Sequence, residues 1–168
     1  MKKYIADIKA ILSEARIKAY TIVNSAMVET YWRIGESIVN NEQSGETRAE
    51  YGKSTLKELS KALTTEFGSG FSYANLRNFR QFYLTYPDVE KCYTLCSKLS
   101  WSHNRLIMRV ENEDARVFYL RESAENNWSV RVLERNISTF YYQRQLSTGK
   151  EGLLPIKIED QNQVTDFR

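Results

Sequence analysis

The first 34 residues of the chain contain neither glycine nor proline, and their apolar side chains recur every three or four positions. Residues at this spacing share one face of an α-helix, so the segment from Ile5 to Ile38 is predicted to be helical. Over its first turns the spacing is close to a coiled-coil seam. The sequence leaves open whether residues 18–24 bend the segment into a hairpin. The seam positions are Ile5, Ile8, Leu12, Ala15, Ala19, Ile22 and Ala26.

Composition favours helices for the rest of the chain as well. The 168 residues include only 7 glycines and 2 prolines, about half the usual share, whereas a sandwich of strands needs many turn residues. No run of about 18 apolar residues predicts a membrane span. Two cysteines cannot form a disulfide framework, and a single histidine excludes multi-histidine metal chemistry. No signal peptide is expected, because charged residues interrupt the N-terminal segment. We therefore expect a cytoplasmic, all-α helical bundle without a cofactor, containing one or two helix-turn-helix-like units.

Glycine, proline and helix-capping residues divide the chain into further helices. A polar loop is expected at residues 40–50, and a second helix over Tyr51–Phe67 ends at Gly68, where a left-handed residue can close the last turn. Ser72 is the predicted N-cap of a third helix that stops before Pro87. Later helices are expected through Val110, through Leu120 and through Tyr141. Their predicted caps are Ser100 or Ser102, then Asn112, then Ser129.

Two regions are expected: a helical domain at residues 1–147 and a polar tail at residues 148–168. The apolar run Leu153–Ile156 is a candidate short strand in the tail.

The net charge of +3 is concentrated in the middle of the chain. Residues 1–52 carry 7 basic and 7 acidic side chains, residues 53–109 carry 9 and 4, and residues 110–168 carry 8 and 10. A basic segment between neutral and acidic ones is a candidate surface for a polyanion such as DNA. A solvated helix surface accounts for the same charges equally well.

The segment from Leu56 to Tyr83 has the layout of a helix-turn-helix. Once Leu76, Phe79 and Phe82 face the core, the outer face of the third helix is rich in Arg and Asn, which pair with base edges and hold phosphates. Any helical hairpin on a surface also has a polar outer face. The candidate DNA-binding residues here are Lys53, Lys61, Tyr73, Asn75, Arg77, Asn78 and Arg80.

A second candidate unit lies between Leu99 and Ile137. Its serine-capped helix and its later Trp-Ser-Val-Arg-Val-Leu-Glu-Arg run are similar in pattern to the helix-turn-helix region of ParB-type partition proteins. By this analogy His103 and Arg105 lie at the head of one helix. Arg131 and Arg135 lie on the outer face of another, where all four are predicted to contact DNA.

Ordered motifs over residues 5–146 resemble those of another protein family more closely than the ParB-type pattern. They include Tyr31-Trp32-Arg33-Ile34-Gly35, Phe67-Gly68-Ser69-Gly70-Phe71-Ser72, Asn75-Leu76-Arg77, Leu99-Ser100-Trp101-Ser102-His103 and Asn127-Trp128-Ser129-Val130-Arg131. In these motifs the chain resembles the YhcG-like family. The resemblance implies a helical N-terminal domain that binds or targets DNA and usually precedes a PD-(D/E)XK nuclease domain.

The sequence departs from the family plan where catalysis is concerned. It ends at Arg168, before any nuclease domain, and it contains no Glu-x-Lys, which the nuclease motif needs beside a metal-binding Asp. Pro87-Asp88 is followed by Glu90-Lys91, which is too close to form that motif. We therefore expect a module that is not an enzyme by itself.

Two functions remain open at this level. One is a module that binds double-stranded DNA. The other is a protein-interaction scaffold that forms a homodimer through the N-terminal helix, or that recruits a separate nuclease subunit, because the seam from Ile5 to Ala26 is long for one domain to cover.

Overall fold

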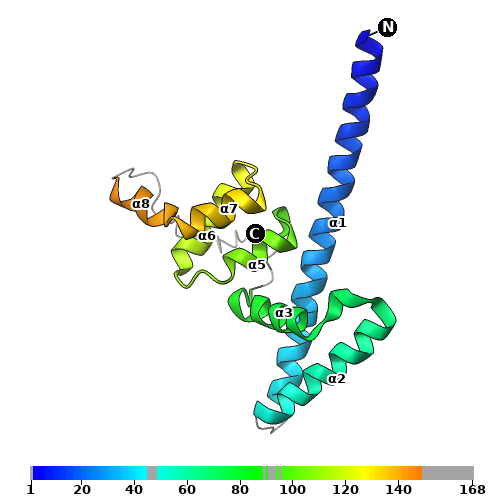
Figure 1. Ribbon diagram of the computed structural model, residues 1–168, viewed down its shortest axis with the longest axis vertical. Coiled ribbons are helices and arrows are strands. Elements are labelled where there is room, and N and C mark those ends of the chain that lie inside the picture. Colours follow the sequence, from blue (N-terminus) through cyan, green and yellow to red (C-terminus); the bar gives the residue numbers. More distant parts are fainter. Residues whose placement is uncertain (1, 45–48, 89, 91–93, 95, 149–168) are drawn as a thin grey trace, which may run out of the picture.

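The computed structural model describes residues 2–44, 49–88, 90, 94 and 96–148, with the side chains of residues 2, 43, 44 and 49–53 excluded. Within these ranges every regular element is helical, which confirms the predicted all-α class (Figure 1). No helix there combines the length and the apolar character that crossing a membrane requires. The elements are α1 (Lys2–Ser44), α2 (Ala49–Phe67), the 3-10 turn η1 (Ser69–Phe71), α3 (Tyr73–Thr85), the 3-10 turn η2 (Cys96–Lys98), α5 (Trp101–Ile107), α6 (Glu113–Glu125), α7 (Val130–Ser138) and α8 (Tyr141–Ser147).

Helix α1 is one continuous helix of 43 residues, so residues 18–24 do not form a hairpin. It also continues through Ser44, and the prediction of a loop beginning at residue 40 was wrong. The apolar side chains of Ile38 and Val39 are buried, and Glu42 forms an ion pair with Arg80 of α3, so contacts with the rest of the chain extend along this last part of α1. The expected strand over Leu153–Ile156 lies outside the described residues.

Helix α3 crosses α1 at very short range. A Cβ atom at Gly35 would lie 2.2 Å from the backbone oxygen of Phe79, so the two helices meet backbone to backbone there. One turn earlier, the Tyr31 ring stacks on the Phe79 ring with their centroids 4.3 Å apart. Leu56 of α2 and Leu76 of α3 complete a small core with Ile38 and Phe79. This core fixes α2 and α3 at one end of α1 (Figure 1).

A second core lies beside the middle of α1 and is formed mainly by α5–α8. Val28 and Trp32 of α1 pack into it, and the Trp32 indole Nε1–H donates a hydrogen bond to the Tyr86 carbonyl at 2.7 Å. Asn104, which is fully buried, donates from Nδ2 to the Cys96 carbonyl at 2.9 Å. Trp101 packs against both cores and so links the two groups of helices.

Local signals predicted most of the shorter helix boundaries. The side chains of Ser72, Asn112 and Ser129 each accept a hydrogen bond from a first-turn amide, which confirms all three as N-caps. Gly68 follows α2 with a positive φ of 90°, a conformation that favours glycine. Ser100 is the N-cap residue of α5, but its hydroxyl contacts His103 instead of a first-turn amide.

Three expectations about these helices were wrong. The last predicted helix is interrupted at Phe140, whose φ of 54° separates α7 from α8. Helix α5 ends at Ile107 instead of reaching Val110, because the Met108 amide and its neighbours close the helix in a turn. Phe67, which its spacing from Leu56, Leu59 and Leu63 predicts on the same face of α2, is 61% exposed, and its ring meets the Phe71 ring at an edge.

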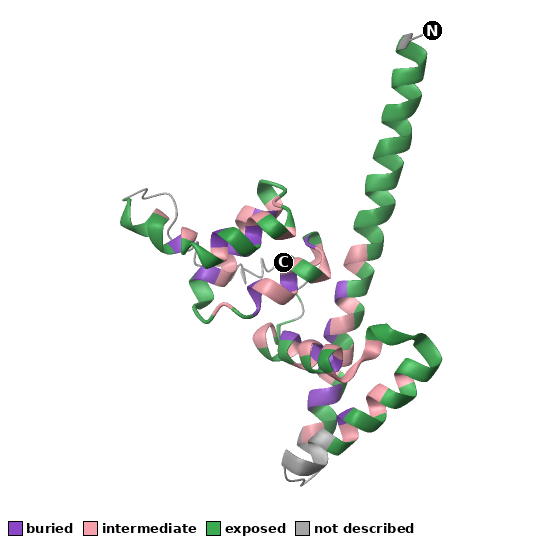
Figure 2. Cartoon of the chain, viewed as in Figure 1, coloured by how far each residue is buried: buried purple, intermediate pink, exposed green. Residues whose placement is uncertain are grey.

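The N-terminal half of α1 projects from the rest of the molecule. Every residue from Lys3 to Val23 is exposed, and Val28 is the first buried residue of the helix (Figure 2). We call residues 3–23 the arm.

Candidate nucleic-acid interface

Helices α6 and α7 are joined by a four-residue turn. Asn127 adopts a left-handed φ of 49°, and the next amide, that of Trp128, donates to the Ser123 carbonyl at 3.1 Å. Ser129 then caps α7, its Oγ accepting from the Val132 amide at 3.3 Å. Helix-turn-helix proteins join their two helices through three or four residues, so this connection has a suitable length.

Helix α7 has one buried face and one exposed, basic face. Leu133 and Asn136 are buried, whereas Arg131, Glu134 and Arg135 are exposed. Arg131 and Arg135 lie one turn apart, and neither guanidinium forms an ion pair with any described residue. Two unpaired guanidinium groups on one helix face can contact phosphates or the acceptor atoms of guanine.

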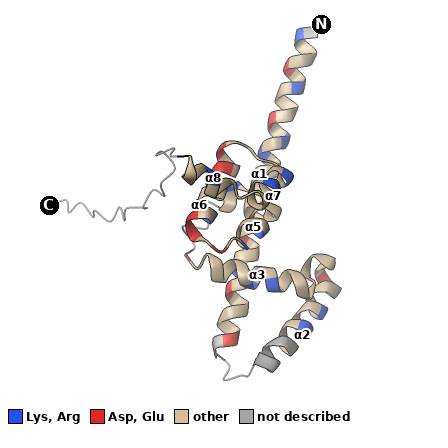
Figure 3. Ribbon diagram, turned by 60° about the vertical axis from the view of Figure 1, so that its left-hand side comes forward, with Lys and Arg blue, Asp and Glu red and all other residues tan. Residues whose placement is uncertain are grey.

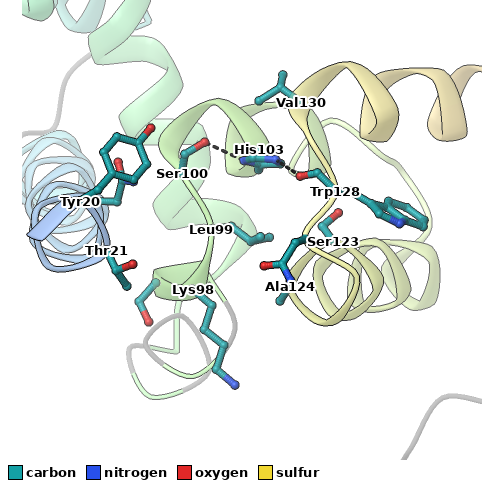
Figure 4. Close-up of a pocket in the computed structure, with 13 residues that line it drawn as sticks. Tyr20, Thr21, Lys98, Leu99, Ser100, His103, Ser123, Ala124, Trp128 and Val130 are labelled. Carbon is teal, nitrogen blue, oxygen red and sulfur yellow. Dashed lines mark hydrogen bonds between the residues drawn. The ribbon is translucent and has the colours of Figure 1, made fainter. Parts of the chain in front are cut away.

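His103 fixes the turn that precedes α7 (Figure 4). Its Nε2 lies 2.9 Å from the Trp128 carbonyl oxygen and its Nδ1 lies 2.7 Å from Ser100 Oγ. Because a carbonyl oxygen can only accept, Nε2 carries a proton, and Nδ1 and the Ser100 hydroxyl share a second hydrogen bond. The ring thereby joins α5 to the α6–α7 turn, and both of its nitrogens are engaged within the protein.

Tyr119 supports α7 from the core side, a role that the sequence analysis missed. Its hydroxyl donates to the Asn136 carbonyl at 3.2 Å and accepts from the Tyr142 amide at 3.3 Å, so it ties α6 to both α7 and α8. Burial raises the pKa of this hydroxyl, which keeps it a neutral donor. A tyrosine within an otherwise apolar helix face was the available signal, because a buried phenol needs a partner.

The candidate DNA-binding residues on α2 and α3 differ in whether their side chains are already bonded within the protein. Arg77 and Lys61 are exposed and form no ion pair with any described residue. Arg80, in contrast, donates from Nε to both carboxylate oxygens of Glu42, at 2.7 and 3.0 Å. Asn75 donates from Nδ2 to the Gly70 carbonyl at 2.8 Å, which holds its amide on the turn before α3.

The other three candidate DNA-binding residues of α2 and α3 are either partly buried or not described. Tyr73 packs against the core formed with α2, Asn78 is half-buried, and the side chain of Lys53 lies outside the described part of the chain.

The predicted residues therefore fall on two parts of the molecule. One group belongs to α2 and α3, at the end of α1, and the other belongs to α5 and α7, beside its middle (Figure 1). Basic positions occur on both groups of helices (Figure 3). Of the second group, Arg105 is half-buried and, among the described residues, has no carboxylate partner.

A cavity of about 300 Å³ lies between α1 and the α6–α7 turn (Figure 4). Tyr20 and Thr21 of α1 form one wall, and His103, Ser123 and Trp128 form the other. Among the described residues, no carboxylate or thiol belongs to its lining, and no group of His, Cys, Asp and Glu could hold a metal ion.

Comparison with known proteins identifies the family. The family described as the DUF1016 N-terminal domain matches residues 7–144, which is most of the chain. The chain belongs to this family. It is also 36% identical to a protein of Escherichia coli (strain K12) named "Putative nuclease YhcG", over 86% of the chain and 46% of that protein. The chain spans about half the length of this curated relative. No solved structure gives a significant match.

Proposed function

We propose that this DUF1016 N-terminal domain binds double-stranded DNA and serves a nuclease-associated protein as a targeting module that is not catalytic by itself. The nuclease association is supported by the name of the E. coli relative. The DNA-binding role is carried by one observation, the exposed face of α7 with the unpaired guanidinium groups of Arg131 and Arg135.

In this proposal α6 and α7 act as the two helices of a helix-turn-helix, and α7 enters the major groove. A recognition helix contacts base edges with residues near its N-terminus, where Arg131 lies. Arg135, one turn further, reaches a phosphate or a second base. His103, Tyr119 and Ser129 do not contact DNA; they are positioning residues that fix the direction of α7.

Helix α3 offers a second, smaller set of contacts. Arg77 of α3 and Lys61 of α2 are the available cations there, whereas Arg80 is neutralised by Glu42 and Asn75 is held by Gly70. We therefore assign α3 an auxiliary role in contacting the phosphate backbone, and we assign base recognition to α7.

The test is fluorescence anisotropy of a labelled DNA duplex with the full chain over a series of salt concentrations. Binding should weaken steeply as salt rises, because each neutralised phosphate releases counterions. Removing two contacts with Arg131→Ala/Arg135→Ala should weaken binding at least tenfold and flatten the slope of log K against log salt by about 2.

The matched control removes two cations that lie elsewhere, Lys3→Ala/Arg33→Ala on α1. It has the same net charge as the α7 variant, so a nonspecific effect of charge would weaken both equally. Equal weakening, or no binding of the wild type at low salt, would contradict the proposal. The second result would favour the alternative, a scaffold that recruits a separate nuclease.

A further inference from the structure

The arm exposes a large apolar surface along most of its length, and only its end, at Tyr20 and Thr21, faces the cavity beside the α6–α7 turn. Its large apolar side chains include Ile11, Leu12, Ile22 and Val23, each more than half exposed. No residue of the arm is even partly buried (Figure 2). Most of the stability of a protein helix comes from packing of its apolar face, and large exposed apolar patches mark interaction sites. The arm is therefore built to be covered.

Most apolar side chains of the arm form one stripe, and it faces away from the rest of the molecule. The seam positions Ile5, Ile8, Leu12, Ala15, Ala19 and Ile22 repeat with a spacing of three and four residues. At 3.6 residues per turn this stripe lies on roughly the opposite side of α1 from Val28, Trp32 and Gly35, which contact the two cores. A partner can therefore approach the whole stripe without meeting α3 or α5.

The charges beside the seam indicate which partner fits. Lys9 and Arg16 flank the seam on one side and Lys18 flanks it on the other, while Asp7 and Glu14 lie away from it. The charged side chains on these flanks, Lys9, Arg16 and Lys18, are therefore all cations. A partner helix must place apolar or acidic side chains beside these three cations.

We propose that the arm pairs with the arm of a second copy of this chain, in parallel, as a short coiled coil. In a parallel coiled coil, the residues that directly precede Ile5, Leu12 and Ala19 each face the residue five positions later on the partner helix. This places Tyr4 beside Lys9, Ile11 beside Arg16 and Lys18 beside Val23. Each cation then meets an apolar side chain that its aliphatic stem can cover, and no two cations meet.

An antiparallel pair of arms is disfavoured by the same residues. Aligning Ile5 with Ile22 of the other copy matches the apolar layers, but it brings Lys9 beside Arg16 at two places. Like charges at such positions oppose pairing. The parallel arrangement also stacks Ala15 on Ala15 and Ala19 on Ala19, which lets the two helices approach closely.

The test is sedimentation of the full chain between about 1 and about 100 μM, because self-association depends on concentration. We expect the wild type to pass from monomer to dimer over this range. Leu12→Glu, which places a carboxylate in the seam, should leave a monomer throughout. Ile17→Glu is the matched control: it adds the same charge to the arm at an exposed position off the stripe, and it should dimerise as the wild type does.

Oxidative cross-linking reports the orientation and does not depend on a charge in the seam. In a parallel pair Ile5→Cys should form a covalent dimer with itself, and so should Ile22→Cys. A cross-link that forms only when the two variants are mixed would overturn the parallel arrangement. A wild type that stays monomeric throughout, or equal loss of dimer in Leu12→Glu and Ile17→Glu, would overturn the pairing itself. DNA contact by α7 is independent of these results.

Discussion

At the scale of single residues, Gly35 has the tightest surroundings among the glycines whose environment the structure describes. A Cβ there would also lie 2.8 Å from the Phe79 carbonyl carbon and 3.0 Å from the Tyr83 Cβ. These are atoms of α3, nearly 50 residues further along the chain. The sequence identified Gly35 as an interior glycine of a helix, but the helix that approaches it could not be inferred from local pattern.

We predict that Gly35→Ala lowers the free energy of unfolding by about 1–3 kcal/mol or more, because backbone atoms of α3 must move to admit the methyl group. The effect should appear despite the better helix propensity of alanine, which is worth about 1 kcal/mol in the opposite direction. Denaturant unfolding followed by circular dichroism measures it.

Gly70→Ala is the matched control, since no atom lies within 4 Å of a Cβ at that position. Its free energy of unfolding should stay close to that of the wild type. Equal stability of the Gly35 and Gly70 variants would contradict the close crossing of α1 and α3.

At the scale of elements, sequence signals that act within one helical turn were sufficient to predict where several helices begin or end. The caps Ser72, Asn112 and Ser129 and the closing Gly68 were predicted because each acts on its own helix. The break at Phe140 was missed because a phenylalanine gives no local signal for a left-handed φ.

Ion pairing between elements was equally hidden from the sequence. Glu42 was expected in a loop, so nothing placed its carboxylate next to Arg80, 38 residues later. As a result Arg77 and Arg80 looked equivalent in the sequence. In the structure Arg80 forms an ion pair with Glu42, whereas Arg77 has no ion-pair partner among the described residues.

This difference gives opposite expectations for two neighbouring arginines on α3. Arg77→Ala should weaken DNA binding and reduce the salt slope by about 1, with unchanged stability. Arg80→Ala should leave DNA binding nearly unchanged and lower the free energy of unfolding by up to about 1 kcal/mol, because the pair with Glu42 is partly exposed. Anisotropy and denaturant unfolding of both variants separate the two effects.

The reverse pattern, with Arg80→Ala weakening DNA binding more than Arg77→Ala, would mean that Glu42 releases Arg80 when DNA binds. In that case α3 would have more than the auxiliary role assigned to it.

At the scale of the whole molecule, α1 serves as the common support. It carries α2 and α3 at one end, holds the core of α5–α8 beside its middle, and leaves the arm free at the other end (Figures 1 and 2). The sequence predicted the seam along this helix. It could not show that the seam and the buried face lie on different sides, because that depends on where α3 and α5 dock.

A parallel pair of arms would relate two copies of α7 by a two-fold axis along the coiled coil. Dimeric helix-turn-helix proteins use such symmetry to contact two half-sites. DNA contact by α7 is nevertheless the central claim, since it holds for one copy as well as for two.

The most direct measurement of that claim is an NMR titration of the full chain with a DNA duplex, observing the Nε–Hε groups of the arginines. The signals of Arg131 and Arg135 should shift as DNA is added, because their guanidinium groups are unpaired and exposed on α7. Arg80, bonded through Nε to Glu42, and Arg33 on α1 provide internal references that should stay in place. Unmoved signals for Arg131 and Arg135 at saturating DNA would contradict the assignment of α7 as the DNA-contacting helix.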